Sequence, residues 1–115
     1  MMNLYGEYLR ENRFTDIIHD EYGFMTYAMQ GDDCFIEDAF VLKEHRRKGH
    51  LYKMADQIKA LAIAKEKKFL TATVNLRALD PSASLMAILK YGFKVKSANN
   101  NIIFLEIGKI GRAHV

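Results

Sequence analysis

The spacing of apolar residues changes once along this chain, at Gly49, and this change most limits the folds open to it. Before Gly49, three stretches rich in β-branched and aromatic residues, at about 15–20, 23–29 and 34–42, are separated by the turn-forming segments DEYG and QGDD. This pattern predicts an antiparallel meander of three strands. After Gly49 the spacing approaches 3.6 residues, which predicts a long amphipathic helix to about Lys67. The residues on one face of that helix are Leu51, Met54, Ala55, Ile58, Leu61, Ala62 and Lys65.

The remainder of the chain continues to alternate between strand and helix patterns. The stretch FLTATVN at 69–75 predicts a strand, and 82–91 predicts a helix that begins after the only proline and ends at Gly92. A final hairpin is expected from 93–97 and 102–108, joined by the polar turn ANNN.

The two ends carry weaker signals. Residues 3–13 predict a short amphipathic helix, and 108–115 predict a frayed tail. The order is then helix, three strands, helix, strand, helix and two strands, which predicts an α/β (α+β) fold with helices packed on a mixed sheet. A half-apolar chain of 115 residues has the size of one compact domain, so 1–115 is taken as a single unit.

Composition excludes several classes of protein. No apolar run approaches the roughly 20 residues that cross a bilayer, and the polar opening lacks the apolar centre of a signal peptide, so we expect a cytoplasmic protein without a membrane partner. Cys34 is the only cysteine, so an internal disulfide and a cysteine-based metal cluster are both impossible. A small buried side chain is favoured there over a reactive thiol, and we expect no metal site.

A net charge of +3 is modest, so the basic residues matter mainly where they cluster, just before the long helix. That cluster could face nucleic-acid phosphates, a phosphorylated cofactor or only solvent. A helix start leaves backbone N–H groups without intrahelical partners, and Gly49 has no Cβ to keep phosphate oxygens away from them. The cluster contains Lys43, His45, Arg46, Arg47, Lys48, His50 and Lys53.

The run RRKGHL at 46–51 resembles the acetyl-coenzyme A loop of the GCN5-related N-acetyltransferases, the GNAT family, whose pattern is R/Q-x-x-G-x-G/A. The preceding FIEDAFVLKEHRRKG and the later LMAILKYGFKV are similar to the strand that leads into that loop and to the helix with a Gly-Phe pair that closes the family core. The resemblance spans about 22–107, and the chain also resembles the short GNAT-like proteins carried by tailed phages. It implies a mixed, mostly antiparallel, splayed central sheet with helices packed on both faces.

The same resemblance implies an activity and a binding site. The activity is acetyl-CoA-dependent transfer of an acetyl group to an amine, by direct attack on the thioester. The acceptor could be a small amine, a peptide N-terminus or a protein lysine. Backbone groups that would pair with the pantetheine arm belong to Ala39, Phe40 and Val41. Residues that would hold the pyrophosphate are Arg46, Arg47, Lys48, Gly49, His50 and Leu51.

Catalytic groups are less clear from the sequence than the cofactor loop. Glu37 is the candidate general base, because IEDAFV is similar to a segment of polyamine acetyltransferases whose glutamate has that role; a solvated strand-end carboxylate is the alternative. Regular strand alternation would point Glu37 and Asp38 to opposite faces, so only one would line the acceptor cleft, with Asp38 as the fallback. Ile88 occupies the position at which many family members carry a tyrosine, and we expect Tyr91 to pack in the core.

Two other functions remain open. One is a GNAT-fold protein with weakened catalysis that binds a partner protein, with a homodimer that covers a sheet edge as a further option. The other is a nucleic-acid binder. It is disfavoured because the basic residues are confined to one loop and no aromatic residues are interleaved with them to stack on bases.

Overall fold

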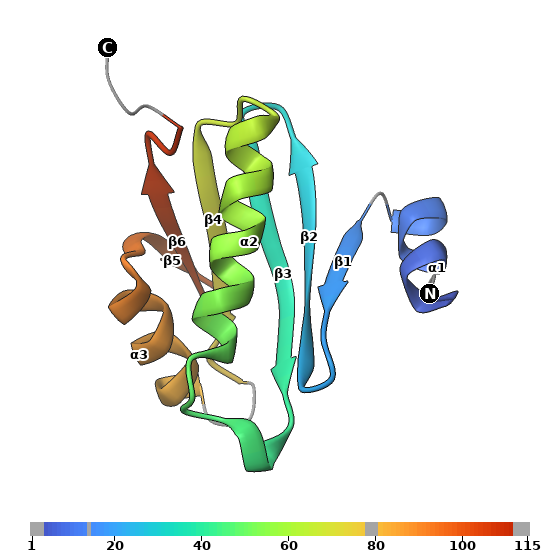
Figure 1. The fold of residues 1–115 in the computed structure, drawn as a ribbon. Coiled ribbons are helices and arrows are strands. Elements are labelled where there is room, and N and C mark those ends of the chain that lie inside the picture. The colour runs from blue at the N-terminus through green and yellow to red at the C-terminus, as the bar shows by residue number, and fades with distance from the viewer. Residues whose placement is uncertain (1–3, 14, 78–80, 112–115) are drawn as a thin grey trace.

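The computed structural model describes residues 4–13, 15–77 and 81–111. It contains three α-helices, one short 3₁₀ turn and six strands in the order expected from the sequence (Figure 1). In chain order the elements are α1 (Leu4–Arg13), β1 (Asp16–His19), β2 (Gly23–Gln30), β3 (Asp33–Val41), η1 (Lys43–His45), α2 (His50–Ala64), β4 (Phe69–Asn75), α3 (Pro81–Tyr91), β5 (Lys94–Asn99) and β6 (Ile102–Gly108).

The six strands form one sheet in the order β1-β2-β3-β4-β6-β5. Every neighbouring pair is antiparallel except β3 and β4, which run parallel. These two strands pair only between Asp33–Ile36 and Phe69–Ala72, after which they diverge (Figure 1). The predicted mixed, mostly antiparallel and splayed sheet is therefore confirmed, and the divergence creates an opening in its middle.

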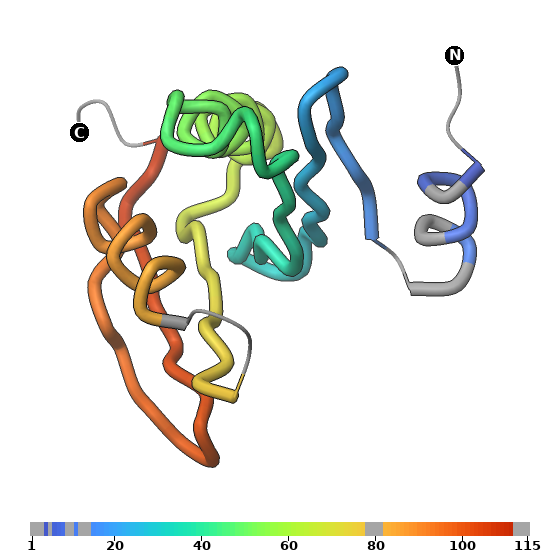
Figure 2. Tube along the Cα trace, turned by 90° about the horizontal axis from the view of Figure 1, so that it is seen from below, coloured from blue at the N-terminus to red at the C-terminus, as the bar shows by residue number. Residues whose placement is uncertain are grey.

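Helices lie on both sides of the sheet. Figure 2 shows α2 and α3 along one side of the curved sheet, whereas α1 lies beyond β1 on the other side. The predicted apolar face of α2 supplies its buried residues, Met54, Ala55, Ile58 and Ala62, which pack against β2 and β3. Burial of such side chains, at about 25 cal/mol per Å² of apolar surface, is what holds an amphipathic helix on a sheet. None of the described helices is both long and apolar enough to cross a bilayer.

The long helix ends at Ala64, three residues before the end expected from its apolar spacing. Glu66 takes a left-handed conformation with φ 60°, which allows the N–H of Lys67 to donate to the Ala62 carbonyl at 2.9 Å. Glycine usually occupies such a position, so the sequence carried no stop signal. Lys67 leaves the helix, and its Nζ donates to the Gly31 carbonyl at 2.7 Å.

The predicted frayed tail is wrong for residues 108–111. Gly108 completes β6, and Ile110 is 7% exposed, with its N–H donating to the Lys68 carbonyl at 3.1 Å. Burial of one apolar side chain ties this segment down, which a composition-based reading of the tail could not detect. Residues 112–115 lie outside the described residues. At the other end, α1 covers the predicted range except residue 3, which also lies outside them.

Candidate functional site

The start of α2 is an open helix N-terminus. Gly49 is its N-cap residue, with φ 86° and ψ 8°, and no side chain caps the helix. The first turn contains no acidic residue, and a Cβ built at Gly49 would meet nothing within 4 Å. The backbone N–H groups of His50, Leu51 and Tyr52 therefore begin the helix without a capping side chain, at the positive end of its dipole. This arrangement suits an anion.

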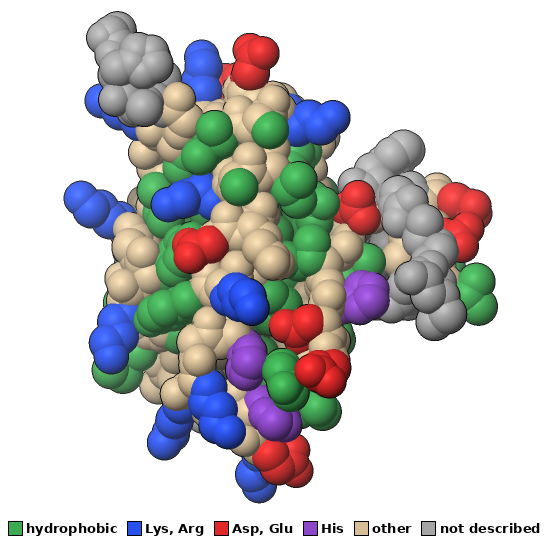
Figure 3. Space-filling view, in the orientation of Figure 1, with side chains coloured by type: hydrophobic (Ala, Val, Ile, Leu, Met, Phe, Trp, Pro, Cys, Tyr) green, Lys and Arg blue, Asp and Glu red, His purple; other side chains and the backbone are tan. Residues whose placement is uncertain are grey.

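Histidine and basic side chains gather around this helix start, at the lower end of the molecule in Figure 3. Arg47 and Lys48 are exposed, whereas Arg46 is engaged with the end of β3. Its Nε donates to the Val41 carbonyl at 2.8 Å, and its guanidinium lies 5.6 Å from the centre of the Phe40 ring. Arg46 therefore fixes the loop to β3 in addition to contributing charge.

Two histidines of the basic cluster pack at a tilt against a tyrosine that the sequence did not single out. The Tyr22 ring lies 4.3 Å from His45 and 4.6 Å from His50, measured between ring centres. Tyr22 belongs to the turn between β1 and β2, where Asp20 accepts hydrogen bonds from the Tyr22 and Gly23 N–H groups at 2.7 and 3.0 Å. These hydrogen bonds, chiefly that from Tyr22, lower the pKa of Asp20. The DEYG segment was the signal for this turn, but its contact with the loop is a tertiary feature.

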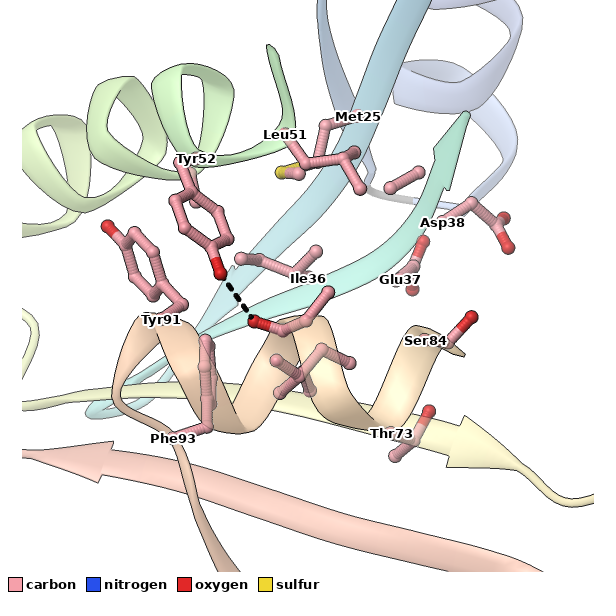
Figure 4. Close-up of a pocket in the computed structure, with 15 residues that line it drawn as sticks. Met25, Ile36, Glu37, Asp38, Leu51, Tyr52, Thr73, Ser84, Tyr91 and Phe93 are labelled. Atoms are coloured by element: carbon pink, nitrogen blue, oxygen red, sulfur yellow. Dashed lines mark hydrogen bonds between the residues drawn. The ribbon is translucent and has the colours of Figure 1, made fainter. Parts of the chain in front are cut away.

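A cavity of about 210 Å³ occupies the opening where β3 and β4 diverge (Figure 4). Most of its lining is apolar. The first turn of α2 and one side of α3 close it on the helical side of the sheet. The lining residues are Met25, Ile36, Glu37, Asp38, Ala39, Leu51, Tyr52, Ala55, Ala72, Thr73, Ser84, Ala87, Ile88, Tyr91 and Phe93. Leu51 is half-buried against the core, and its side chain lines the cavity.

A β-bulge shapes the β3 wall of the cavity. The register passes from Ile36 opposite Tyr27 to Asp38 opposite Thr26, which leaves Glu37 without an opposing residue on β2. The N–H of Asp38 donates to Thr26 Oγ1 at 3.0 Å. A bulge interrupts the regular alternation of side chains, and here both Glu37 and Asp38 line the cavity. The expectation that only one of them would line the cleft fails for this reason.

Glu37 is the more enclosed of the two carboxylates. It is half-buried, and the hydroxyl of Thr15 donates to its Oε1 at 3.0 Å, whereas Asp38 is exposed. Thr15 is itself 1% exposed, so one carboxylate oxygen is held in place by a buried donor. The pairs between β3 and β4 stop at Ile36, so within the described chain the edge from Glu37 onward faces the cavity and not a neighbouring strand.

Tyr91 packs against the core. Its ring contacts Tyr52 and Phe93, at 5.6 and 5.9 Å between ring centres. Its hydroxyl donates to Asp56 Oδ1 at 2.6 Å, and burial, followed by this hydrogen bond, raises the pKa of Tyr91. Ile88 lies on the same helix and lines the cavity floor.

Tyr52 is a further cavity residue that sequence reasoning missed. It lies in the first turn of α2, and its hydroxyl points across the cavity mouth to the Ala87 carbonyl, 3.4 Å away (Figure 4). It directly follows the last residue of the cofactor-loop pattern, but only the packing of α2 against α3 brings it to the cavity.

Other forms of reactive chemistry find little support among the described residues. No group of three or more His, Cys, Asp or Glu side chains in this part of the chain is arranged to hold a metal ion. Cys34 is fully buried, and burial raises the pKa of its thiol to about 11. A protonated, buried thiol is a poor nucleophile, which fits the structural role expected for it.

Comparisons of the sequence found no matching family model and no matching curated protein. Comparison of the structure gave clear matches. PaiA N-acetyltransferase from Thermoplasma acidophilum, solved in complex with coenzyme A, superposes with a TM-score of 0.74 at 14% identity over 87% of this chain. A GNAT family acetyltransferase from Elizabethkingia anophelis, solved with acetyl-CoA bound, gives a TM-score of 0.69 at 15% identity over 91% of this chain. The chain has the GNAT fold.

This chain spans different shares of the solved structures that it matches. This chain spans 64% of the PaiA chain and 81% of the Elizabethkingia chain. It spans 96% of the anti-CRISPR protein AcrVA5, with a TM-score of 0.65 at 13% identity over 78% of this chain. At these identities the likeness establishes the GNAT fold, and it confirms the fold that the sequence resemblance implied.

Proposed function

We propose that this chain is an acetyl-CoA-dependent N-acyltransferase that acts on an amine. One observation carries the proposal: the open start of α2 lies directly beside a cavity that separates two parallel strands. Coenzyme A and acetyl-CoA are the ligands in the PaiA and Elizabethkingia structures, which share this fold.

The residues present suit each part of the cofactor. A diphosphate needs N–H donors and positive charge, which residues 46–51 supply around an uncapped helix start. An extended arm with amide groups needs a free strand edge, which Ala39, Phe40 and Val41 supply because β4 has diverged from them. A thioester needs a mainly apolar space next to a base, which the cavity beside Glu37 supplies.

Bound acetyl-CoA would supply an activated thioester carbonyl. In the proposed reaction Glu37 removes a proton from the incoming ammonium group, so that the amine can attack. The Thr15 hydrogen bond holds one oxygen of that carboxylate, which leaves the other free for the proton. Asp38, on the same cavity wall, is the alternative base.

Two measurements test this function. Coenzyme A at millimolar concentration should raise the melting temperature, since a ligand that binds only the folded state stabilises it by mass action. A panel of small amines, peptides and lysine-containing proteins should then reveal an acceptor by release of free thiol from acetyl-CoA. The absence of any thermal shift would refute the proposal outright.

The second candidate is a GNAT-fold protein that has lost efficient catalysis and binds a partner protein. Ile88 on the cavity floor and the engaged hydroxyl of Tyr91 support this reading, because neither residue offers a free proton donor from α3. This chain also matches the anti-CRISPR protein AcrVA5 over nearly all of that protein's length. A thermal shift with coenzyme A, without thiol release for any amine, would favour this candidate. Light scattering would test for a homodimer. Salt-dependent binding to oligonucleotides, without any thermal shift from coenzyme A, would instead favour a nucleic-acid-binding function.

A further inference from the structure

We propose, on the basis of the acyltransferase function above, that Tyr52 donates the proton that the sulfur atom takes up as it leaves the acetyl group. The tyrosine comes from α2 and faces the cavity from the wall nearest α3 (Figure 4). Nothing in the sequence pattern assigns it this role.

The choice follows from the hydroxyl groups that line the cavity within the described part of the chain. They belong to Tyr52, Thr73, Ser84 and Tyr91. Phenols are far better proton donors than aliphatic hydroxyls, because the phenolate charge is delocalised and an ordinary phenol has a pKa of about 10. This leaves the two tyrosines.

Tyr91 is committed elsewhere. Its hydroxyl donates to Asp56 at 2.6 Å, a short hydrogen bond to a carboxylate, and in Figure 4 it points away from the cavity centre. To protonate a group in the cavity, Tyr91 would have to break this bond and turn its ring within a packed contact. Tyr91 therefore acts as part of the wall.

The Tyr52 hydroxyl is held only weakly. Its contact with the Ala87 carbonyl is 3.4 Å long, against about 2.7–2.8 Å for a typical O–H···O hydrogen bond, so a better acceptor can replace it. Its ring packs against the Tyr91 ring, with 5.6 Å between centres and 58° between planes. Because Tyr91 is anchored to Asp56, one helical turn beyond Tyr52 on α2, the ring direction of Tyr52 is supported while its proton stays exchangeable.

The charged groups around Tyr52 lie on different walls. Asp56 is occupied by Tyr91, and Lys59 Nζ lies 5.7 Å from the centre of the Tyr91 ring. Glu37 and Asp38 are on β3, across the cavity. The proposed acid on α2 and the proposed base on β3 therefore belong to separate elements, which allows one proton to be removed on one side and another delivered on the opposite side.

When the tetrahedral adduct collapses, the C–S bond breaks and its electron pair goes to sulfur, while the Tyr52 O–H bond breaks and its proton goes to the same sulfur. The products are the amide, the free thiol of coenzyme A and a phenolate at Tyr52. The nitrogen that attacked gives its extra proton to water as the adduct collapses, and water returns a proton to the phenolate, so the net transfer is one proton from the amine to the thiol.

A binding measurement tests the contact without any turnover. Calorimetric titration at pH 9, where part of the coenzyme A thiol is ionised, should give tighter binding of coenzyme A than of desulfo-coenzyme A to the wild-type protein. We expect a difference on the order of tenfold, the value of one hydrogen bond to a charged group. Tyr52→Phe should abolish the difference and retain the affinity for desulfo-coenzyme A. Equal binding of the two ligands by the wild-type protein would overturn the assignment, whereas failure of both to bind would overturn the acyltransferase function itself.

Kinetics with the best amine from the acceptor panel supply the second test. Tyr52→Phe should lower kcat at least tenfold with little change in KM for acetyl-CoA, and should lack the alkaline fall in rate that ionisation of a phenolic acid gives the wild-type profile. Tyr91→Phe is the matched comparison, because it removes a hydroxyl from the same wall and the anchor of the supporting ring. It should lower kcat less than Tyr52→Phe does and should retain the alkaline fall in rate. If the wild-type protein is active and Tyr52→Phe retains full kcat, Tyr52 is not the acid.

Discussion

Gly49 offers the sharpest test of the anion site, because Gly31 provides a matched control. Both glycines have a left-handed backbone, with φ 86° and 58°, and a Cβ at either would meet nothing within 4 Å. Alanine at such a position costs roughly 1–2 kcal/mol of backbone strain. We expect Gly49→Ala at the upper end of this range, because its φ lies further from the left-handed minimum near 57°, and Gly31→Ala at the lower end.

The two variants should differ in their response to coenzyme A. The Cβ of Gly49→Ala would occupy the open space proposed for the diphosphate, whereas Gly31 lies in the turn between β2 and β3. At 100 times its Kd, coenzyme A should stabilise the wild-type protein by about 2.7 kcal/mol. Each tenfold loss of affinity removes about 1.4 kcal/mol of that stabilisation.

Urea denaturation with and without coenzyme A measures both effects. Gly31→Ala should lose stability but keep the full ligand-induced gain, whereas Gly49→Ala should lose stability and most of that gain. An undiminished gain in Gly49→Ala would refute the placement of the diphosphate at the α2 start. An equal loss of the gain in both variants would show that strain alone, and not the position of the Cβ, reduces binding.

Three further predictions concern buried and half-buried groups. Glu37→Gln should lower kcat by about 10²–10⁴-fold and keep the stabilisation by coenzyme A, since the amide oxygen can still accept the hydrogen bond from Thr15. A rate within threefold of wild type would rule out Glu37 as the base. Cys34 should resist thiol reagents in the folded protein, and rapid labelling of native protein would contradict this. The free energy of unfolding should also fall as the pH rises from about 9 to about 11, because only the folded state keeps the Cys34 thiol protonated over that range. The raised pKa of Tyr91 should likewise contribute folding stability that is present below about pH 10 and lost above it. Urea midpoints at pH 9 and 11 should therefore show a smaller fall for Tyr91→Phe than for wild type; equal falls would argue against the burial of this hydroxyl together with its Asp56 contact.

Local sequence patterns predicted most of the fold. Alternation of period two before Gly49 and of period 3.6 after it placed the strands and α2, because each pattern reflects which side of one element is buried. The end of α2 was placed wrongly because Glu66 adopts a conformation that usually belongs to glycine, and the tail was misjudged because the burial of Ile110 depends on partners far away in the chain.

The candidate site also combines features that the sequence predicts with features that only tertiary packing sets. The uncapped helix start after Gly49 was predictable from the sequence, because a glycine and adjacent basic residues before a helix are a local pattern. Anion binding by the loop at 46–51 stays a prediction. The cavity was not predictable, since it depends on where β3 and β4 stop pairing and on how α2 meets α3. The bulge at Glu37, which brings two neighbouring carboxylates to one cavity, depends on register with β2.

By itself, then, the sequence determined the order of the elements, the apolar face of α2 and the position of the basic loop before it, because hydrophobic period and glycine placement act over a few residues. Only the tertiary structure decided which side chains meet around the cavity: it engaged Tyr91 with Asp56, opened Tyr52 to the cavity and held Glu37 against Thr15. Those contacts join residues separated by 22 to 35 positions, and such pairings are set by the packing of whole elements.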